Sequence, residues 1–142
     1  MSDSKPVIAS VDMVIYNEKD EILLIKRGND PYKGMWAFPG GRIDGTDKDI
    51  LSAAYRELKE ETNILDVDVT LSYVTTIGNN TRDPRGFCLS NIFVGYCPTQ
   101  TIIKAGDDAT EYGWFRYNEL PPMAFDHNEI MTKYFSPTNW NN

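Results

Sequence analysis

The stretch Arg56-Glu57-Leu58-Lys59-Glu60-Glu61, which follows the Gly-rich turn Pro39-Gly40-Gly41, decides which fold and chemistry this sequence predicts. On a helix, Glu57, Glu60 and Glu61 occupy one face, because residues three and four apart are surface neighbours. Three like charges this close repel one another unless a cation neutralises them. Carboxylate oxygens suit Mg²⁺ or Mn²⁺, which keep coordination positions open for water and substrate phosphates. The pattern therefore predicts a divalent-metal site.

A helix is expected from about residue 50 to residue 62 to carry these acids. Asp47 or Asp49 is suited to cap its start, and Asn63 is suited to the left-handed conformation that ends a helix. An apolar stripe beside the acidic face is predicted to pack inward, so that the acids lie at a rim. The stripe consists of Leu51, Ala54 and Leu58.

Runs of β-branched and apolar residues, separated by turn formers, predict strands on both sides of this helix. The first two runs read as a β-hairpin around residues 17–20. A second helix is expected to begin at a capping box of Asp126 and Glu129 and to continue through Tyr134, and residues 139–142 are expected to fray. The expected strands are residues 7–16, 21–26, 67–77, 87–97 and 112–117. Together these elements predict a single α/β domain over residues 1–142, with a mixed sheet.

Composition limits the cellular locations and the partners that are compatible with this sequence. The chain has 142 residues, of which 41% are hydrophobic and 25% charged, and it contains no apolar run long enough to span a bilayer. We expect a cytoplasmic protein without a membrane partner, since no secretory signal is visible. The net charge of -7 opposes binding to nucleic acid but is compatible with a small phosphorylated substrate. Cys88 and Cys97 are expected to be free thiols, because nine residues along one strand separate them by about 30 Å.

The segment from Gly41 to Ile64 resembles a Nudix box, whose pattern is G-x5-E-x7-R-E-U-x-E-E-x-G-U with U aliphatic. Residues 56–61 match the second half of the pattern fully, and Ile64 fits its last position. The sequence departs from the pattern at Asn63, which replaces a Gly, and at Asp47, which replaces the early Glu. The spacing from Asp47 to the box arginine is also one residue longer than in the pattern.

Four further segments resemble the ADP-ribose pyrophosphatase branch of that family, namely residues 33–41, 82–86, 105–109 and 124–127. The resemblance implies an α/β/α sandwich with a mixed sheet. It also implies hydrolysis of a nucleoside diphosphate derivative, with ADP-ribose giving AMP and ribose 5-phosphate, and Mg²⁺ or Mn²⁺ as the cofactor. Dimers are common in this branch, so a homodimer is compatible with the resemblance.

Matched to the box, Glu57, Glu60 and Glu61 are the implied metal ligands and Arg56 the residue that holds the acidic cluster in place. Glu57 has an alternative role, which is to orient or deprotonate the attacking water. A further acid often lies outside the box. The candidates are Asp107, Asp108 and Glu111.

Candidate substrate-binding residues lie in the loops. Arg82 and Arg85 are suited either to contact phosphate or ribose or to form salt bridges within their loop. Trp36 and Phe38 are suited to stack on a base or to fill the core. Gly40 and Gly41 give the turn beside them a backbone freedom that other residues lack. For His127, the only histidine, a structural role at a helix start is favoured over catalysis.

Two other functions share the same metal face. One is a hydrolase that removes modified nucleoside triphosphates from the nucleotide pool. The other is a noncatalytic nucleotide sensor, which the altered first half of the box suggests.

Overall fold

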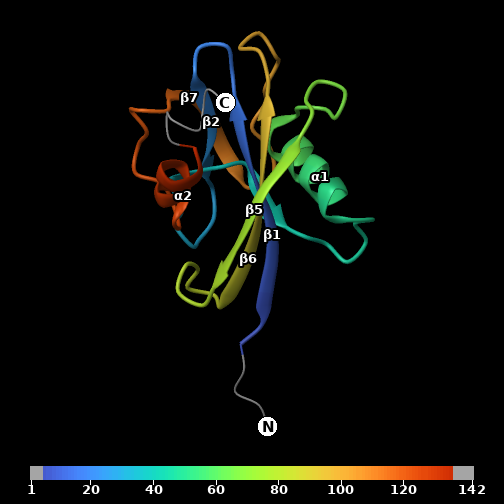
Figure 1. Ribbon diagram of the computed structural model, residues 1–142, viewed down its shortest axis with the longest axis vertical. Helices are drawn as coiled ribbons and strands as arrows, with labels where there is room; N and C mark the ends of the chain where they lie inside the picture. Colours follow the sequence, from blue (N-terminus) through green and yellow to red (C-terminus); the bar gives the residue numbers. More distant parts are fainter. Residues whose placement is uncertain (1–4, 136–142) are drawn as a thin grey trace.

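The computed structural model describes residues 5–135, and within that range the chain forms seven strands and two helices (Figure 1). The strands are β1 (Val7–Tyr16), β2 (Glu21–Arg27), β3 (Trp36–Ala37), β4 (Gly40–Arg42), β5 (Ser72–Asn79), β6 (Phe87–Tyr96) and β7 (Ala109–Arg116). The helices are α1 (Ile50–Thr62) and α2 (His127–Tyr134).

The strands form one mixed sheet in the order β3-β2-β1-β6-β5, with β4 paired to β1 and β7 paired to β2. The central pair, β1 and β6, is parallel and in register from Val7 opposite Phe87 to Tyr16 opposite Tyr96. The other pairs are antiparallel. This arrangement confirms the mixed sheet predicted from the sequence.

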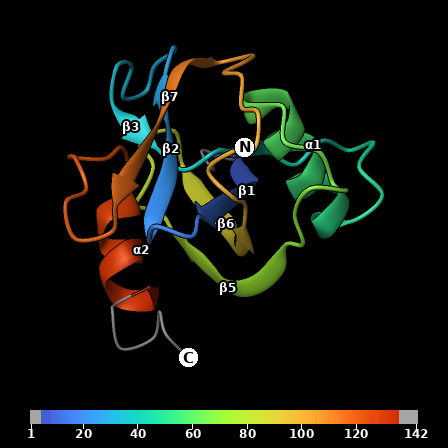
Figure 2. The same cartoon turned by 90° about the horizontal axis from the view of Figure 1, so that it is seen from above.

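The two helices cover opposite faces of this sheet (Figures 1 and 2). Successive residues of a strand point to opposite faces. Accordingly, Met13 and Leu23 belong to the core beneath α1, whereas Val14 and Leu24 belong to the core beneath α2. The α/β/α sandwich implied by the family resemblance is thus confirmed.

Strand β1 has two different neighbours along the same edge, and this forks the sheet. Its end pairs with β2, where Tyr16 lies opposite Ile22, as expected for the hairpin. Its earlier part pairs instead with β4, where Asp12 lies opposite Gly40. The backbone of Met13 also bonds to Pro39, with 2.8 Å between the nitrogen and the carbonyl oxygen. The Gly-rich turn is therefore inserted between two strands that have separated.

Helix α1 has the predicted bounds. Asp49, rather than Asp47, caps its start, because the Asp49 carboxylate accepts a hydrogen bond of 2.8 Å from the Ser52 backbone. Asn63 ends the helix with φ of 64°. The predicted stripe is wrong at Leu51, which is 43% exposed; Ala53 is buried beside Ala54 and Leu58 in its place.

Two other predictions need correction. The strand expected from residue 67 begins at Ser72, and residues 66–68 form a turn in which Val67 is 83% exposed. The capping box at α2 is also wrong, since Asp126 occupies the cap position but makes no capping hydrogen bond. Its carboxylate binds Arg82 instead.

The remaining expectations concern the cysteines and the chain end. Cys88 and Cys97 are buried free thiols, as expected. Within residues 5–135, no helix is long and apolar enough to cross a membrane. The predicted fraying at residues 139–142 lies outside the described residues.

Two leucines of α1 provide a test of this packing. Leu58→Ala is expected to lower the free energy of unfolding by about 2 to 5 kcal/mol, because Leu58 is fully buried and its truncation leaves a cavity. Leu51→Ala on the exposed side should change that energy by about 0.5 kcal/mol or less. Urea unfolding of both variants measures the difference, and equal losses would contradict the observed orientation of the helix.

Candidate functional site

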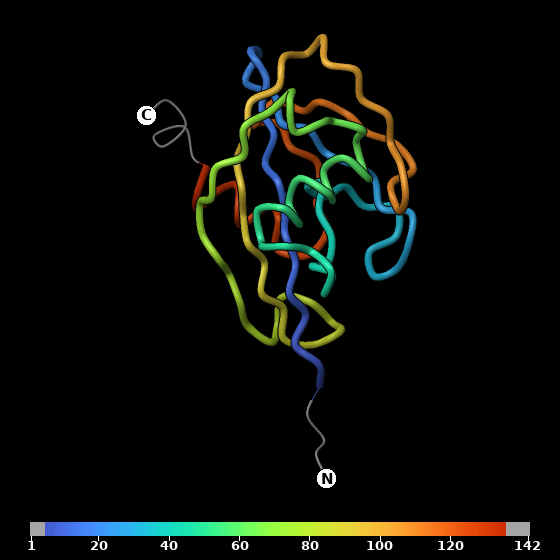
Figure 3. The backbone as a smooth tube through the Cα atoms, turned by 90° about the vertical axis from the view of Figure 1, so that its right-hand side faces the viewer, coloured from blue at the N-terminus to red at the C-terminus, as the bar shows by residue number. Residues whose placement is uncertain are grey.

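A cavity of about 510 Å³ opens where the sheet forks. One end is acidic and lies against α1, where Glu57 and Glu61 line it. The other end is rich in arginine. Arg27 of β2 lies there, with Arg82 and Arg85 of the loop between β5 and β6. Seen from the side, that loop lies near the start of β1 (Figure 3). The arginines that line the cavity are Arg27, Arg42, Arg56, Arg82 and Arg85.

The Gly-rich turn is packed directly against the acids of α1. A Cβ atom at Gly41 would overlap the Glu57 carboxylate, so any larger residue there would displace this acid. The backbone nitrogen of Gly40 donates a hydrogen bond of 3.4 Å to Oε2 of Glu61. Glu60 differs from these acids, since its side chain is 41% exposed and does not line the cavity. The expected rim position therefore holds for Glu60 but is wrong for Glu61, which is buried.

Burial dominates the electrostatics of these acids. It raises the pKa of Glu61 to about 9, and repulsion from Glu57 adds to the effect, while the Gly40 hydrogen bond opposes it. Burial also raises the pKa of Glu57, although Arg56 stabilises its charged form. Two adjacent carboxylates thus lie where negative charge is costly, which is typical of a functional site.

Arg56 holds the acidic cluster together. Its guanidinium donates two hydrogen bonds to Asp47, at 2.7 and 2.8 Å, and others to Glu57 at 2.7 Å and Glu60 at 3.1 Å. The Asp47 pairing is bidentate and lowers the pKa of Asp47 to about 2. Within residues 5–135, no three acidic, histidine or cysteine side chains converge as a metal-ligand set in this conformation.

At the opposite end, two arginines are held by aspartates. Arg82 makes a bidentate pair with Asp126 of 2.9 and 2.7 Å, and Arg85 pairs with Asp83 at 3.0 and 2.8 Å. The guanidinium of Arg85 also lies 5.9 Å from the Phe125 ring. Both arginines therefore form loop salt bridges and line the cavity at the same time.

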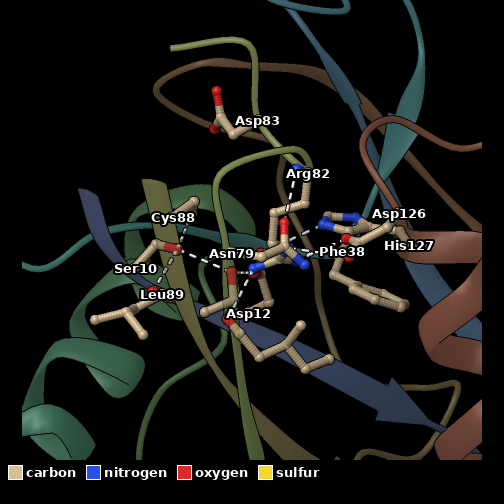
Figure 4. A network of polar contacts seen from close by, with 12 residues as sticks. Ser10, Asp12, Phe38, Asn79, Arg82, Asp83, Cys88, Leu89, Asp126 and His127 are labelled. Carbon is tan, nitrogen blue, oxygen red and sulfur yellow. Dashed lines mark hydrogen bonds and ion pairs between the residues drawn. The ribbon is translucent and has the colours of Figure 1, made fainter. Parts of the chain in front are cut away.

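A polar network forms the floor between the two ends (Figure 4). The Ser90 hydroxyl lies 2.8 Å from Oδ2 of Asp12 and 3.0 Å from the Ser10 hydroxyl. His127 stacks on Phe38 and accepts a 3.2 Å hydrogen bond from its backbone nitrogen at Nδ1. Ser10, Asp12 and Ser90 were not among the site residues predicted from the sequence.

The other candidates divide between the cavity and its surroundings. Phe38 is buried and lines the cavity, whereas Trp36 packs against Phe115 in the core beneath α2 and does not line it. Of the three acids predicted to supplement the box, Asp108 lines the cavity. Among the described lining residues, neither Asp107 nor Glu111 appears, and Glu111 lies 3.7 Å from Lys26 on the sheet.

Comparison with known proteins identifies the class to which this fold and site belong. The NUDIX domain model matches residues 6–134, and the chain therefore belongs to the Nudix hydrolase family. It is 41% identical over 133 residues to an ADP-ribose pyrophosphatase of Methanocaldococcus jannaschii, a match that covers 91% of this chain and 73% of the relative.

Other relatives carry different functions. The ADPR responsive transcriptional repressor NtrR of Acinetobacter baylyi is 31% identical over 144 residues, and the match covers 97% of this chain but only 57% of the repressor. Among solved structures, the NUDIX domain of Shewanella oneidensis NrtR complexed with ADP ribose has a TM-score of 0.78 at 26% identity, with 90% of this chain and 86% of that chain covered. The sequence relatives thus include both a pyrophosphatase and a transcriptional repressor.

The buried imidazole leads to a pH prediction. Burial lowers the pKa of His127, and the nearby Asp12 opposes this only in part. Below about pH 6.5 the unfolded chain therefore takes up a proton at this site before the folded chain does, so stability falls as pH falls. Above that pH both states are neutral and the contribution is fully present.

Unfolding in urea between about pH 7.5 and pH 5.5 measures this effect. Wild-type protein should lose more stability over that range than His127→Asn, which cannot titrate. Because His127 is the only histidine, its NMR titration also reports the pKa directly. A pKa above about 6.5 in the folded protein would contradict the prediction.

Proposed function

We propose that this chain hydrolyses the pyrophosphate bond of a nucleoside diphosphate derivative with the help of Mg²⁺ or Mn²⁺, and that its substrate is ADP-ribose, which yields AMP and ribose 5-phosphate. The observation that carries the proposal is that one cavity joins the half-buried Glu57 and the buried Glu61 to an end rich in arginine. The pyrophosphatase relative, at 41% identity, supports the choice of substrate.

Glu57, Glu60 and Glu61 would hold the divalent cation. Their chemistry fits one, because hard oxygen donors are crowded on one helical turn, where Glu61 is buried and the Glu57 side chain is only 12% exposed. A bound ion would lower the pKa of a water nucleophile and neutralise phosphate oxygens. A manganese ion is present with AMP in a related structure from Francisella tularensis, which has a TM-score of 0.75 at 30% identity and covers 92% of this chain.

The other residues of the site position these groups. Arg56 orients Glu57 and Glu60 through direct hydrogen bonds, so it acts on the acids rather than on the substrate. Gly40 and Gly41 allow the turn to approach these acids closely, because a Cβ atom at either position would overlap its neighbours. Arg82 and Arg85 present guanidinium groups to the far end of the cavity, where they would bind the rest of the nucleotide.

Substitution of the buried acid tests this assignment. Glu61→Gln is expected to lower AMP release from ADP-ribose by about 100-fold or more, because a neutral amide cannot replace a ligand carboxylate. The control is Glu129→Gln on the exposed face of α2, which should retain wild-type activity. Full activity in Glu61→Gln, with an unchanged melting temperature, would refute the metal assignment.

Metal removal and a substrate panel test the reaction class. EDTA should abolish AMP release, and added Mg²⁺ or Mn²⁺ should restore it. ADP-ribose should be turned over faster than 8-oxo-dGDP or modified nucleoside triphosphates. Saturable binding of ADP-ribose without any product, in the presence of either metal, would instead identify a nucleotide sensor.

A further inference from the structure

His127 carries a proton whose position the structure fixes. Because Nδ1 accepts the hydrogen bond from the Phe38 backbone, the single proton of the neutral ring lies on Nε2. The ring is stacked on Phe38 with 4.5 Å between centroids, and its side chain is only 4% exposed. Nε2 is therefore a rigidly held hydrogen-bond donor.

That donor faces an acceptor without bonding to it. Nε2 lies 3.9 Å from Oδ1 of Asp12, which is too far for a hydrogen bond. The other oxygen of this carboxylate, Oδ2, accepts the hydrogen bond from Ser90. Among residues 5–135, Nε2 has no hydrogen-bond partner, and His127 and Asp12 both line the cavity. The two residues thus frame a gap that suits a group able to accept and donate at once.

The gap lies next to the acids proposed to bind the metal. Asp12 pairs with Gly40 across β1 and β4, and a Cβ atom at Gly40 would lie 2.6 Å from Oδ1. Gly40 in turn bonds to Glu61 through its backbone nitrogen. A diphosphate held at Glu57 and Glu61 would therefore bring the sugar directly attached to it towards Asp12 and His127.

We propose that His127 and Asp12 form a specificity site for one hydroxyl group of a pentose attached to the diphosphate, a proposal that rests on the proposed function. His127 donates from Nε2 to the hydroxyl oxygen, and the hydroxyl proton is donated to Oδ1 of Asp12. A sugar that lacks this hydroxyl leaves a donor and an acceptor of the cavity lining without partners in the bound complex, and sites of this kind discriminate strongly against such analogues.

The test compares kcat/KM for ADP-ribose with kcat/KM for monodeoxy analogues that each lack one hydroxyl of either ribose. We expect wild-type protein to disfavour one analogue by about 10-fold or more. Asp12→Asn replaces the acceptor by an amide, and His127→Asn retains an acceptor near Nδ1 but has no atom at Nε2. Both variants should reduce the discrimination to about 3-fold or less, mainly through slower turnover of ADP-ribose. Cys88→Ala, which also alters the cavity lining, should keep the wild-type ratio.

A second measurement separates this proposal from the proposed function. The imidazole ¹⁵N signals of His127 should report a proton on Nε2, and the Nε2 signal should move when ADP-ribose binds in EDTA. AMP release with equal kcat/KM for all analogues would overturn the hydroxyl site and leave the proposed function standing. If no AMP is released, the proposed function fails; a shifted Nε2 signal would then still support the site, and an unshifted signal would overturn it.

Discussion

The burial of Glu61 is the constraint on which the rest of the site depends. A carboxylate that is 7% exposed and lies near Glu57 is costly to keep ionised, and its hydrogen bond from Gly40, at 3.4 Å, is long. The fold tolerates this cost because apolar cores on both faces of the sheet stabilise the domain. A carboxylate whose ionised form is this costly lowers the stability of the domain. Its position is therefore better explained by a bound cation than by a structural role.

The fork in the sheet allows these acids to meet the rest of the cavity. If β1 and β2 were paired along their whole length, β4 would have no place beside β1, and the Gly-rich turn could not reach α1. Since the strands pair only at Tyr16 and Ile22, the turn enters the gap and Gly41 lies against Glu57. One irregularity in strand pairing thus creates both the cavity and its acidic end.

Local chemistry made some elements predictable from the sequence. The bounds of α1 follow from capping by Asp49 and from the left-handed Asn63, which depend only on neighbouring residues. The start of β5 did not follow from the pattern, because Val69 and Leu71 are buried without belonging to a strand. An apolar pattern reports burial and not backbone pairing. The capping role predicted for Asp126 was wrong because Arg82, which is 44 residues away in sequence, binds its carboxylate.

The floor of the cavity was overlooked although the sequence contained a signal for it. Ser10 and Asp12 are two apart in a strand that is otherwise largely apolar, so they point to the same face. Ser90 lies opposite Ser10 on the parallel strand β6 and joins the same network. Polar residues at alternate positions of a central strand mark a buried polar surface. Which ligand they face depends on β4 and α2, and only the fold brings those elements together.

The distribution of charge explains how a chain with net charge -7 can accept an anionic ligand. Arg56, Arg82 and Arg85 are each paired with an aspartate, so their guanidinium groups are held in place. Arg27 also lines the cavity, and it forms no ion pair within the described part of the chain. Local potential rather than net charge governs binding in a cleft. The diphosphate would therefore lie at the acids, whose repulsion a divalent ion would remove, while the rest of the nucleotide would meet the fixed guanidinium groups of Arg82 and Arg85 at the other end of the cavity.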